Sequence, residues 1–222
     1  TVSSNMSLLQ QAAQDPGKPL NVATASVVQW MSKTAQVEKI KRFAIVSVGI
    51  GNTVGSAATV AIGRAAAGQG LRVMMLDLSS GEAGVHMLAG LPPGPGIADM
   101  LAGKADFTSI VTRDPHSAAH LVRFGIDRSA KTVQLLTSQL DRILNTLNGI
   151  YDLVIINAGE LSSSAQILAG KVQAALLMAP AVRQREVASA VQALKASGMN
   201  AVEFVALVQG VDQNDGSVRA AG

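Results

Sequence analysis

The residues with the clearest chemical potential follow an apolar run that begins at Phe43. The segment Gly49–Ser56 has the spacing of a Walker A loop, G-x-x-x-x-G-K-[ST], in which backbone N–H groups and a helix amino terminus bind phosphates. The candidate phosphate-contacting residues are Gly49, Gly51, Asn52, Thr53, Gly55 and Ser56. Gly55 stands where the motif has its lysine, and no lysine occurs between Lys41 and Lys104. The loop therefore lacks the charge that neutralises the β- and γ-phosphates.

Two more positions where such a site needs an acid carry a neutral residue in this chain. Asp77 ends the apolar run VMML, where an acid could lie near magnesium, but Ser79 follows where a second acid would be expected. Asn157 ends the run LVII, where a Walker B aspartate would hold the water shell of magnesium. We expect no metal site and degenerate catalytic positions at Gly55, Ser79 and Asn157. Asp77 is either a residual metal ligand or a carboxylate satisfied by backbone donors.

Several of these residues also have a purely structural interpretation. Ser56 could cap its helix, and the loop glycines could serve only to allow a tight turn. His116 and His120 are spaced for one helical face, but without a third ligand they favour a loop or surface role over metal binding. Arg183 and Arg185 fit the solvated start of a helix or a nucleotide contact.

Short apolar runs alternate with helical patterns and predict the elements that position these loops. Continuous apolar character is typical of parallel strands covered on both faces, and the expected strands are 43–48, 73–76, 133–136, 153–156, 174–179 and 202–208. The expected helices are 22–31, 56–69, 96–102, 138–148, 163–171 and 183–197. This order predicts an α/β fold with a doubly wound, mostly parallel sheet.

The domain organisation follows from the same patterns. Residues 1–37 are expected to form an N-terminal helical arm, residues 38–210 the α/β domain, and residues 211–222 a flexible tail. Trp30 is expected to anchor the arm to the core. The chain begins at Thr1 without methionine, which is typical of a processed protein or a piece of a longer one.

The composition limits the class of protein further. Of 222 residues, 48% are hydrophobic and 15% charged, and none is cysteine, so disulfides and thiol chemistry are excluded. The net charge of +3 comes without a dense basic face, and we expect no nucleic-acid partner. The uncharged stretch from Phe43 to Gly63 has the length of a membrane span, but its central glycines favour a strand, a turn and a helix.

Segments outside the phosphate loop resemble the cytoplasmic domain of bacterial tyrosine kinases and polysaccharide co-polymerases, which act in exopolysaccharide chain-length control and transport. The segment LAGLPPGPGIADMLAGKADFTSIV is similar to the family's stretch around "GLSDVLAG". YDLVIINAGE resembles "YDLVIIDTPP", with Gly159 and Glu160 in place of the two prolines. The last two expected strands and the helix between them are also similar. The resemblance implies a P-loop NTPase-like fold of the MinD/ParA type.

Departures from the family pattern bear on activity. The resemblance implies that active members bind magnesium-ATP through the Walker lysine and two acids, and carry a C-terminal tyrosine cluster. Here the only tyrosine, Tyr151, begins a strand and is expected to pack rather than to be phosphorylated. The family's ring-forming E-x-x-R-x-x-R helix has no counterpart in NVATASVVQWMSK.

The resemblance and these departures together imply a pseudo-kinase-like domain without catalysis. We expect it at the cytoplasmic face of the bacterial inner membrane, joined to the membrane by a part of the protein outside this chain. Its expected partners are other subunits of a polysaccharide export machinery or further copies of itself. No cofactor is expected. The alternatives are an active tyrosine kinase or ATPase using ATP and magnesium, with charge from a residue such as Arg183 or from a partner, and a sensor that binds ATP or ADP without hydrolysis.

Overall fold

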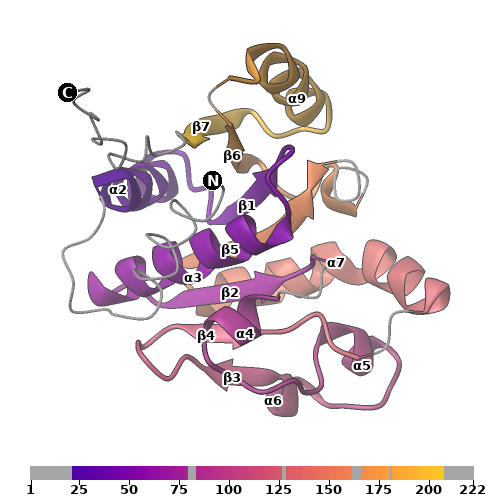
Figure 1. Cartoon of the computed structure of the whole chain (residues 1–222). Helices are drawn as coiled ribbons and strands as arrows, with labels where there is room; N and C mark the ends of the chain where they lie inside the picture. The colour runs from indigo at the N-terminus through magenta and orange to yellow at the C-terminus, as the bar shows by residue number, and fades with distance from the viewer. Residues whose placement is uncertain (1–21, 80–83, 127–128, 162–166, 181, 208–222) are drawn as a thin grey trace, which may run out of the picture.

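The computed structural model describes residues 22–79, 84–126, 129–161, 167–180 and 182–207. Within them, one mostly parallel sheet has the strand order β3-β4-β2-β5-β1-β6-β7 (Figure 1). The strands are β1 (Arg42–Ser47), β2 (Val73–Asp77), β3 (Val111–Arg113), β4 (His120–Val122), β5 (Leu153–Glu160), β6 (Ala174–Pro180) and β7 (Ala201–Leu207). Only the β3–β4 pair is antiparallel among the pairings of these strands. The predicted α/β fold with a doubly wound sheet is confirmed.

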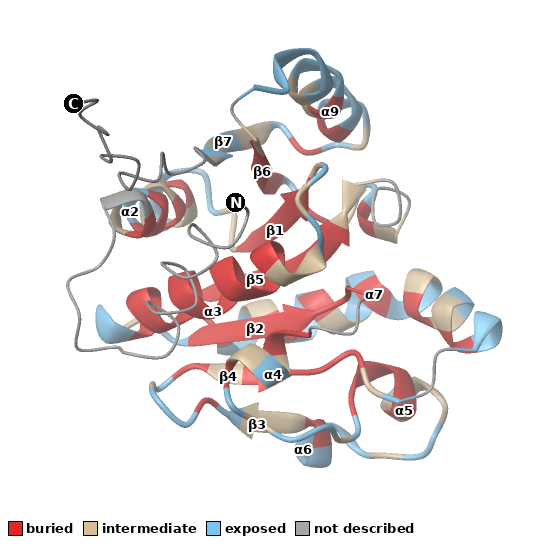
Figure 2. Cartoon of the chain, viewed as in Figure 1, coloured by how far each residue is buried: buried red, intermediate tan, exposed pale blue. Residues whose placement is uncertain are grey.

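Helices cover both faces of the sheet. They are α2 (Val22–Val37), α3 (Asn52–Gly68), α4 (Val85–Leu88), α5 (Ile97–Leu101), α6 (Phe107–Ile110), α7 (Ala130–Ile150) and α9 (Gln184–Ala196). Successive residues of β1 point to opposite faces, so Phe43 and Ile45 pack with α2 and α3, while Ala44 and Val46 belong to the core under α5, α7 and α9. Figure 2 shows β1, β2 and β5 buried between these two layers, while the edge strands β3 and β7 are partly exposed.

The arm is held by an aromatic contact. The rings of Trp30 on α2 and Phe43 on β1 meet edge to face, with centroids 5.4 Å apart. The prediction that Trp30 anchors the arm to the core is therefore confirmed. Residues 1–21 of the arm and the tail 211–222 lie outside the described residues.

One predicted strand is wrong. Residues 133–136 lie inside α7, whose buried positions Thr132, Leu136, Leu140, Leu144 and Leu147 recur every three or four residues. Ser129 caps this helix by accepting a hydrogen bond from the Thr132 N–H. A run of four apolar residues fits either a strand or one side of a helix. Here the helical spacing of buried residues continues from 132 to 147, which favours the helix. The sequence analysis did not predict β3, β4, α4 and α6, each of which is only three or four residues long.

Other boundaries shift by a few residues. Helix α3 begins at Asn52 rather than Ser56, and α2 extends to Val37. Residues 163–166 of the helix expected over 163–171 lie outside the described residues. The stretch from Phe43 to Gly63 consists of β1, a loop and part of α3. In the described part of the chain, no helix combines the length and apolarity that a membrane span requires.

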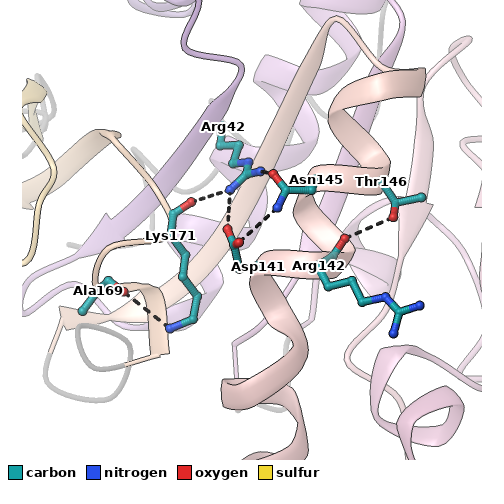
Figure 3. A network of polar contacts seen from close by, with 7 residues as sticks. All are labelled: Arg42, Asp141, Arg142, Asn145, Thr146, Ala169 and Lys171. Carbon is teal, nitrogen blue, oxygen red and sulfur yellow. Dashed lines mark hydrogen bonds and ion pairs between the residues drawn. The ribbon is translucent and has the colours of Figure 1, made fainter.

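Arg42 fixes the start of β1 against the opposite layer (Figure 3). Its Nη1 donates to Asp141 Oδ1 at 3.0 Å and to the carbonyl of Lys171 at 2.9 Å, and its Nη2 donates to Asn145 Oδ1. These contacts join β1 to α7 and to the segment before β6. Because the glycine loop directly follows β1, the network also helps to place that loop.

Candidate functional site

The loop between β1 and α3 has the backbone of a glycine turn. Gly49 and Gly51 have φ values of 65° and 76°, a region that residues with a side chain rarely adopt. Gly51 is the N-cap of α3, so Ser56 lies inside the helix and does not cap it. The capping interpretation of Ser56 is therefore wrong. Asn52 and Thr53 form the first turn of α3, and the turn itself projects two backbone N–H groups toward the end of β5.

A carboxylate of the same chain accepts hydrogen bonds from both loop N–H groups. The N–H of Gly49 donates to Glu160 Oε2 at 3.2 Å, and the N–H of Gly51 donates to Glu160 Oε1 at 3.0 Å. A carboxylate bound by two backbone N–H groups at a helix amino terminus resembles the way such loops hold a phosphate. Glu160 thus takes the position of an anion in this loop.

The path of β5 explains how Glu160 reaches the loop. The β1–β5 register shifts at this point, because Ile45 pairs with Asn157 while Val46 pairs with Gly159. Gly159 has φ 71°, and a Cβ on it would lie 2.8 Å from Asn52 Oδ1 and 3.2 Å from Ser79 Cβ. Only glycine fits this passage, so Gly159 allows β5 to continue past Asn157 and to place Glu160 over the loop.

The side chain of Asn157 lies deeper, in a buried polar cluster. Its Nδ2 is within hydrogen-bond distance of Ser56 Oγ (3.0 Å), Asp77 Oδ1 (3.0 Å) and Ser79 Oγ (3.1 Å). Two hydroxyls and a carboxylate are oxygen ligands of the kind that Mg²⁺ takes in phosphoryl-transfer sites. Here the amide N–H groups point at these oxygens in place of a cation.

Asp77 is 2% exposed and is bonded through both oxygens. Besides the amide, its Oδ1 accepts from Ser79 N (3.1 Å) and Ser79 Oγ (2.7 Å), and its Oδ2 accepts from Val85 N (2.8 Å). Burial raises the pKa of this carboxyl, and the hydrogen bonds from Ser79, Val85 and Asn157 oppose that rise. No group of three or more His, Asp or Glu residues suited to a metal occurs in the described ranges.

The Walker lysine position is closed by packing. A Cβ on Gly55 would lie 2.9 Å from Ser47 Oγ and 3.1 Å from Asn157 Oδ1. Both of these oxygens are buried and have no hydrogen-bond partner among the described residues. A lysine at this position would need its neighbours to move. We refer to Gly49, Gly51, Gly55, Ser56, Asp77, Ser79, Asn157 and Glu160 as the loop site.

The structure separates the remaining candidates. Arg183 reaches the loop, because a Cβ on Gly49 would lie 2.7 Å from its Nη1, and that Nη1 also pairs with Glu186 at 2.8 Å. His120 lies on β4, where its Nδ1 and the hydroxyl of Tyr151 are 2.8 Å apart, so it shares no helical face with His116. Glu160 was missed as a site residue, and its only sequence signal was an acid shortly after a strand.

The strand order and the glycine loop between β1 and α3 define an α/β protein with the P-loop NTPase fold. No family model matches the sequence, and no curated protein matches it. Solved structures do match. The tyrosine kinase domain of BceF has a TM-score of 0.71 at 18% sequence identity, covering 92% of this chain and 90% of that one. The kinase domain of the Escherichia coli tyrosine kinase ETK has a TM-score of 0.73 at 18% identity, covering 96% and 84%.

A more distant likeness is found to MinD. The septum site-determining protein MinD from Pyrococcus horikoshii, complexed with Mg-ADP, has a TM-score of 0.60 at 19% identity, covering 75% of this chain and 70% of that one. The chain therefore has the fold of bacterial tyrosine kinase domains, within the wider MinD-like group. The resemblance inferred from the sequence is confirmed at the level of the fold.

Proposed function

We propose that this chain is a non-catalytic, pseudo-kinase-like domain that acts by protein contacts. The observation on which the proposal rests is the Asn157 amide, which hydrogen-bonds to the oxygens of Ser56, Asp77 and Ser79 where magnesium would have to bind. Phosphoryl transfer depends on cations that neutralise the charge of the transferred group. An amide in this place supplies only partial charge, and its N–H groups bond to the oxygens that the ion would need.

The Glu160 contact supports the same conclusion independently. Its carboxylate holds the N–H groups of Gly49 and Gly51, which a phosphate would need. A bound nucleotide would have to displace this carboxylate and would meet its negative charge nearby. The domain therefore replaces both the anion and the cation of an ATP site with its own side chains.

The biological setting of the proposal comes from the fold likeness. The BceF and ETK structures are tyrosine kinase domains, and the sequence resemblance extends to polysaccharide co-polymerases. We place the domain in an exopolysaccharide export system, at the cytoplasmic face of the inner membrane and linked to it by a part of the protein outside this chain. There it would act in assembly or in chain-length regulation, through contacts with other subunits or with copies of itself.

Nucleotide titration tests the proposal. Thermal unfolding and calorimetry with ATP and ADP, with and without Mg²⁺, are expected to show no magnesium-dependent binding, and labelled ATP is expected to give no phosphate or phosphotyrosine. ATP turnover by the wild-type domain that disappears in Asp77→Asn would overturn it. Asn200→Asp, on an exposed loop residue, serves as the control for nonspecific charge changes.

A nucleotide sensor without hydrolysis is the second candidate. It is favoured by the position of Arg183, whose guanidinium lies against Gly49 beside the loop N–H groups and could pair with a phosphate. In this case ADP or ATP would raise the melting temperature equally with and without Mg²⁺, and Arg183→Gln would abolish the increase.

A further inference from the structure

The amino-terminal edge of the sheet, opposite to the loop site, carries a row of cations. The parallel strands β2, β5, β1 and β6 are neighbours, so the residues that precede them line one edge. Lys41 directly precedes β1, Arg72 precedes β2, and Lys171 lies shortly before β6. Backbone hydrogen bonds join these segments, because Asp152 N donates to the carbonyl of Arg72 and Val154 N to that of Lys41, both at 2.8 Å.

Two helices that end at this edge add further cations. Helix α2 ends at Val37, and Lys39 lies between it and β1. On α7, the exposed Arg142 follows Asp141, which bonds to Arg42 at the first position of β1. In Figure 3 the guanidinium of Arg142 points away from the Arg42 network. We refer to Lys39, Lys41, Arg72, Arg142 and Lys171 as the basic edge.

The charges of the basic edge are only partly neutralised. The ammonium groups of its three lysines donate to backbone carbonyls, at 2.9, 3.2 and 3.4 Å for Lys39, Lys41 and Lys171. A carbonyl satisfies an N–H group but removes no charge. Arg72 does pair with Asp152, at 2.7 Å, and its side chain stays 62% exposed. Glu38 is an exposed acid at the same edge, and the lysines leave a positive excess over it.

Lys39 holds its charge in a backbone conformation that favours glycine. Its φ is 60°, and no other described residue with a side chain has a positive φ. Helices commonly end on a glycine in this conformation, and a residue with a side chain is strained there. Lys39 Nζ donates to the carbonyl of Gln36 in the last turn of α2, so the strained residue holds a cation at the helix end. Strain of this kind is often retained at functional positions.

Exposed apolar side chains lie beside these cations. Val37, the last residue of α2, is 70% exposed, and Ile150, the last residue of α7, is 46% exposed. Lys39 follows Val37 by two positions, and Lys41 donates to the carbonyl of Asn148, two positions before Ile150. Cations mixed with exposed apolar groups are typical of surfaces that contact an anionic bilayer, because headgroups attract the charge and the acyl boundary takes the apolar groups.

We propose that the basic edge is a docking surface for an anionic phospholipid bilayer. Neighbouring strands lie about 4.8 Å apart, so the row from β2 to β6 extends over about 14 Å. Such a row fits several headgroups of a flat surface better than one small anion in a pocket. A nucleic acid would use the cations but not Val37 and Ile150. The sequence shows no dense basic run because segments far apart in the chain supply the charge.

Docking by this edge would turn the loop site away from the bilayer. The loop site lies where the strands end, and the basic edge lies where they begin. Contacts of the loop face with other subunits would then remain accessible. This inference rests on the proposed placement at the inner membrane, but it does not depend on the proposed loss of catalysis.

Vesicle sedimentation tests the docking. The full chain is mixed with vesicles of equal parts phosphatidylcholine and phosphatidylglycerol, and with vesicles of phosphatidylcholine alone. We expect binding to the mixed vesicles only, and its loss in about 1 M sodium chloride, where the Debye length is about 3 Å. Lys39→Gln and Lys171→Gln are each expected to weaken binding by about fivefold. Lys131→Gln, on an exposed residue at the other end of α7, is the matched control and should bind like the wild type.

Two further variants separate docking from folding and from charge alone. Lys39→Gly is expected to weaken binding as much as Lys39→Gln without lowering the melting temperature, because glycine relieves the strain at this φ. Val37→Ser keeps every cation and is expected to weaken vesicle binding by about threefold. Glu38→Gln removes the acid at this edge and should strengthen binding.

Three results would overturn the proposal. Equal binding to both kinds of vesicle, or to neither, would show that the basic edge does not recognise anionic lipid. A loss in Lys131→Gln as large as that in Lys39→Gln would assign binding to the overall charge of the chain. Tighter binding of duplex DNA than of mixed vesicles would identify a different polyanion. None of these outcomes involves nucleotide, so the proposed loss of catalysis is tested separately.

Discussion

The loop site and the side chain of Arg123 lie at the same edge of the sheet but differ in how their polar groups are paired. In the loop site, Glu160 satisfies the N–H groups of Gly49 and Gly51, and Asn157 hydrogen-bonds to the oxygens around Asp77. At Arg123, directly after β4, the guanidinium makes one hydrogen bond among the described residues, to Thr112. In the loop site, side chains of this chain occupy the hydrogen-bonding groups, whereas the Nε of Arg123 has no partner among the described residues.

The largest expected effect is that of Asn157→Asp. A second carboxylate beside the buried Asp77 would lack a cation, so we expect a loss of about 3 kcal/mol of unfolding free energy at pH 7. Repulsion and burial would raise the folded-state pKa of the new carboxyl, so the loss should shrink as the pH falls through that value. Urea unfolding at pH 7 and pH 5 measures both effects.

Magnesium sharpens this experiment. If Mg²⁺ fully restored the stability of Asn157→Asp, a single substitution would be enough to create a metal site beside Asp77. The amide of Asn157 would then be the one feature that keeps the loop site free of metal. Asn200→Asp, on an exposed residue, should leave stability unchanged under all conditions.

Gly159→Ala is expected to cost about 2 kcal/mol more unfolding free energy than a matched glycine substitution, because the new methyl meets Asn52 and Ser79. Gly170→Ala is the match, since Gly170 has φ 70° and no atom near its Cβ position. Thermal or urea unfolding compares the two. Equal losses would show that β5 is not confined at Gly159.

Glu160→Ala is expected to cost about 1 kcal/mol of stability and to free the two loop N–H groups. Inorganic pyrophosphate should then bind in calorimetry to the variant and not to the wild type. Glu203→Ala, on an exposed residue of β7, should do neither. Wild-type binding of pyrophosphate as tight as that of the variant would mean that Glu160 does not close the loop.

The smallest expected effect is that of Arg123→Met, which removes a buried charge that has no counter-charge among the described residues. We expect unfolding free energy to change by about 0.5 kcal/mol or less. Arg64→Met is the contrast, because Arg64 and Asp114 form a buried pair 2.7 Å apart and the substitution leaves the acid alone, at a cost of about 3 kcal/mol. Similar losses at the two positions would indicate that Arg123 already has a counter-charge.

The two regions also differ in how much of their structure could be predicted from the sequence. A known motif fixes where a phosphate-binding loop needs glycine and charge. The sequence alone therefore predicted the glycine spacing of 49–56 and the neutral residues at Gly55, Ser79 and Asn157. The strand β5 was predicted, but its passage beyond Asn157 was not, because the register shift and the tight space around Gly159 arise from packing between segments far apart in the chain.

Arg123 illustrates a harder limit. Its neighbours in the sequence, HLVRFGI, contain no motif, and its isolation depends on which acids the fold brings near it. Residue types alone could not predict that Arg64 pairs with Asp114, or that Arg123 bonds only to Thr112 among the described residues. Pairing of charges is a property of the tertiary structure, and residue types alone do not determine it.

The crowding around Gly55 has a consequence for the history of the domain. A lysine introduced there alone would strike Ser47 and Asn157 before its ammonium could serve a phosphate, and an aspartate introduced alone at 157 would face Asp77 without a cation. We expect each of these single substitutions to lower stability before it gives any function. Under the proposed function, a return to an ATP site would therefore need several coordinated substitutions.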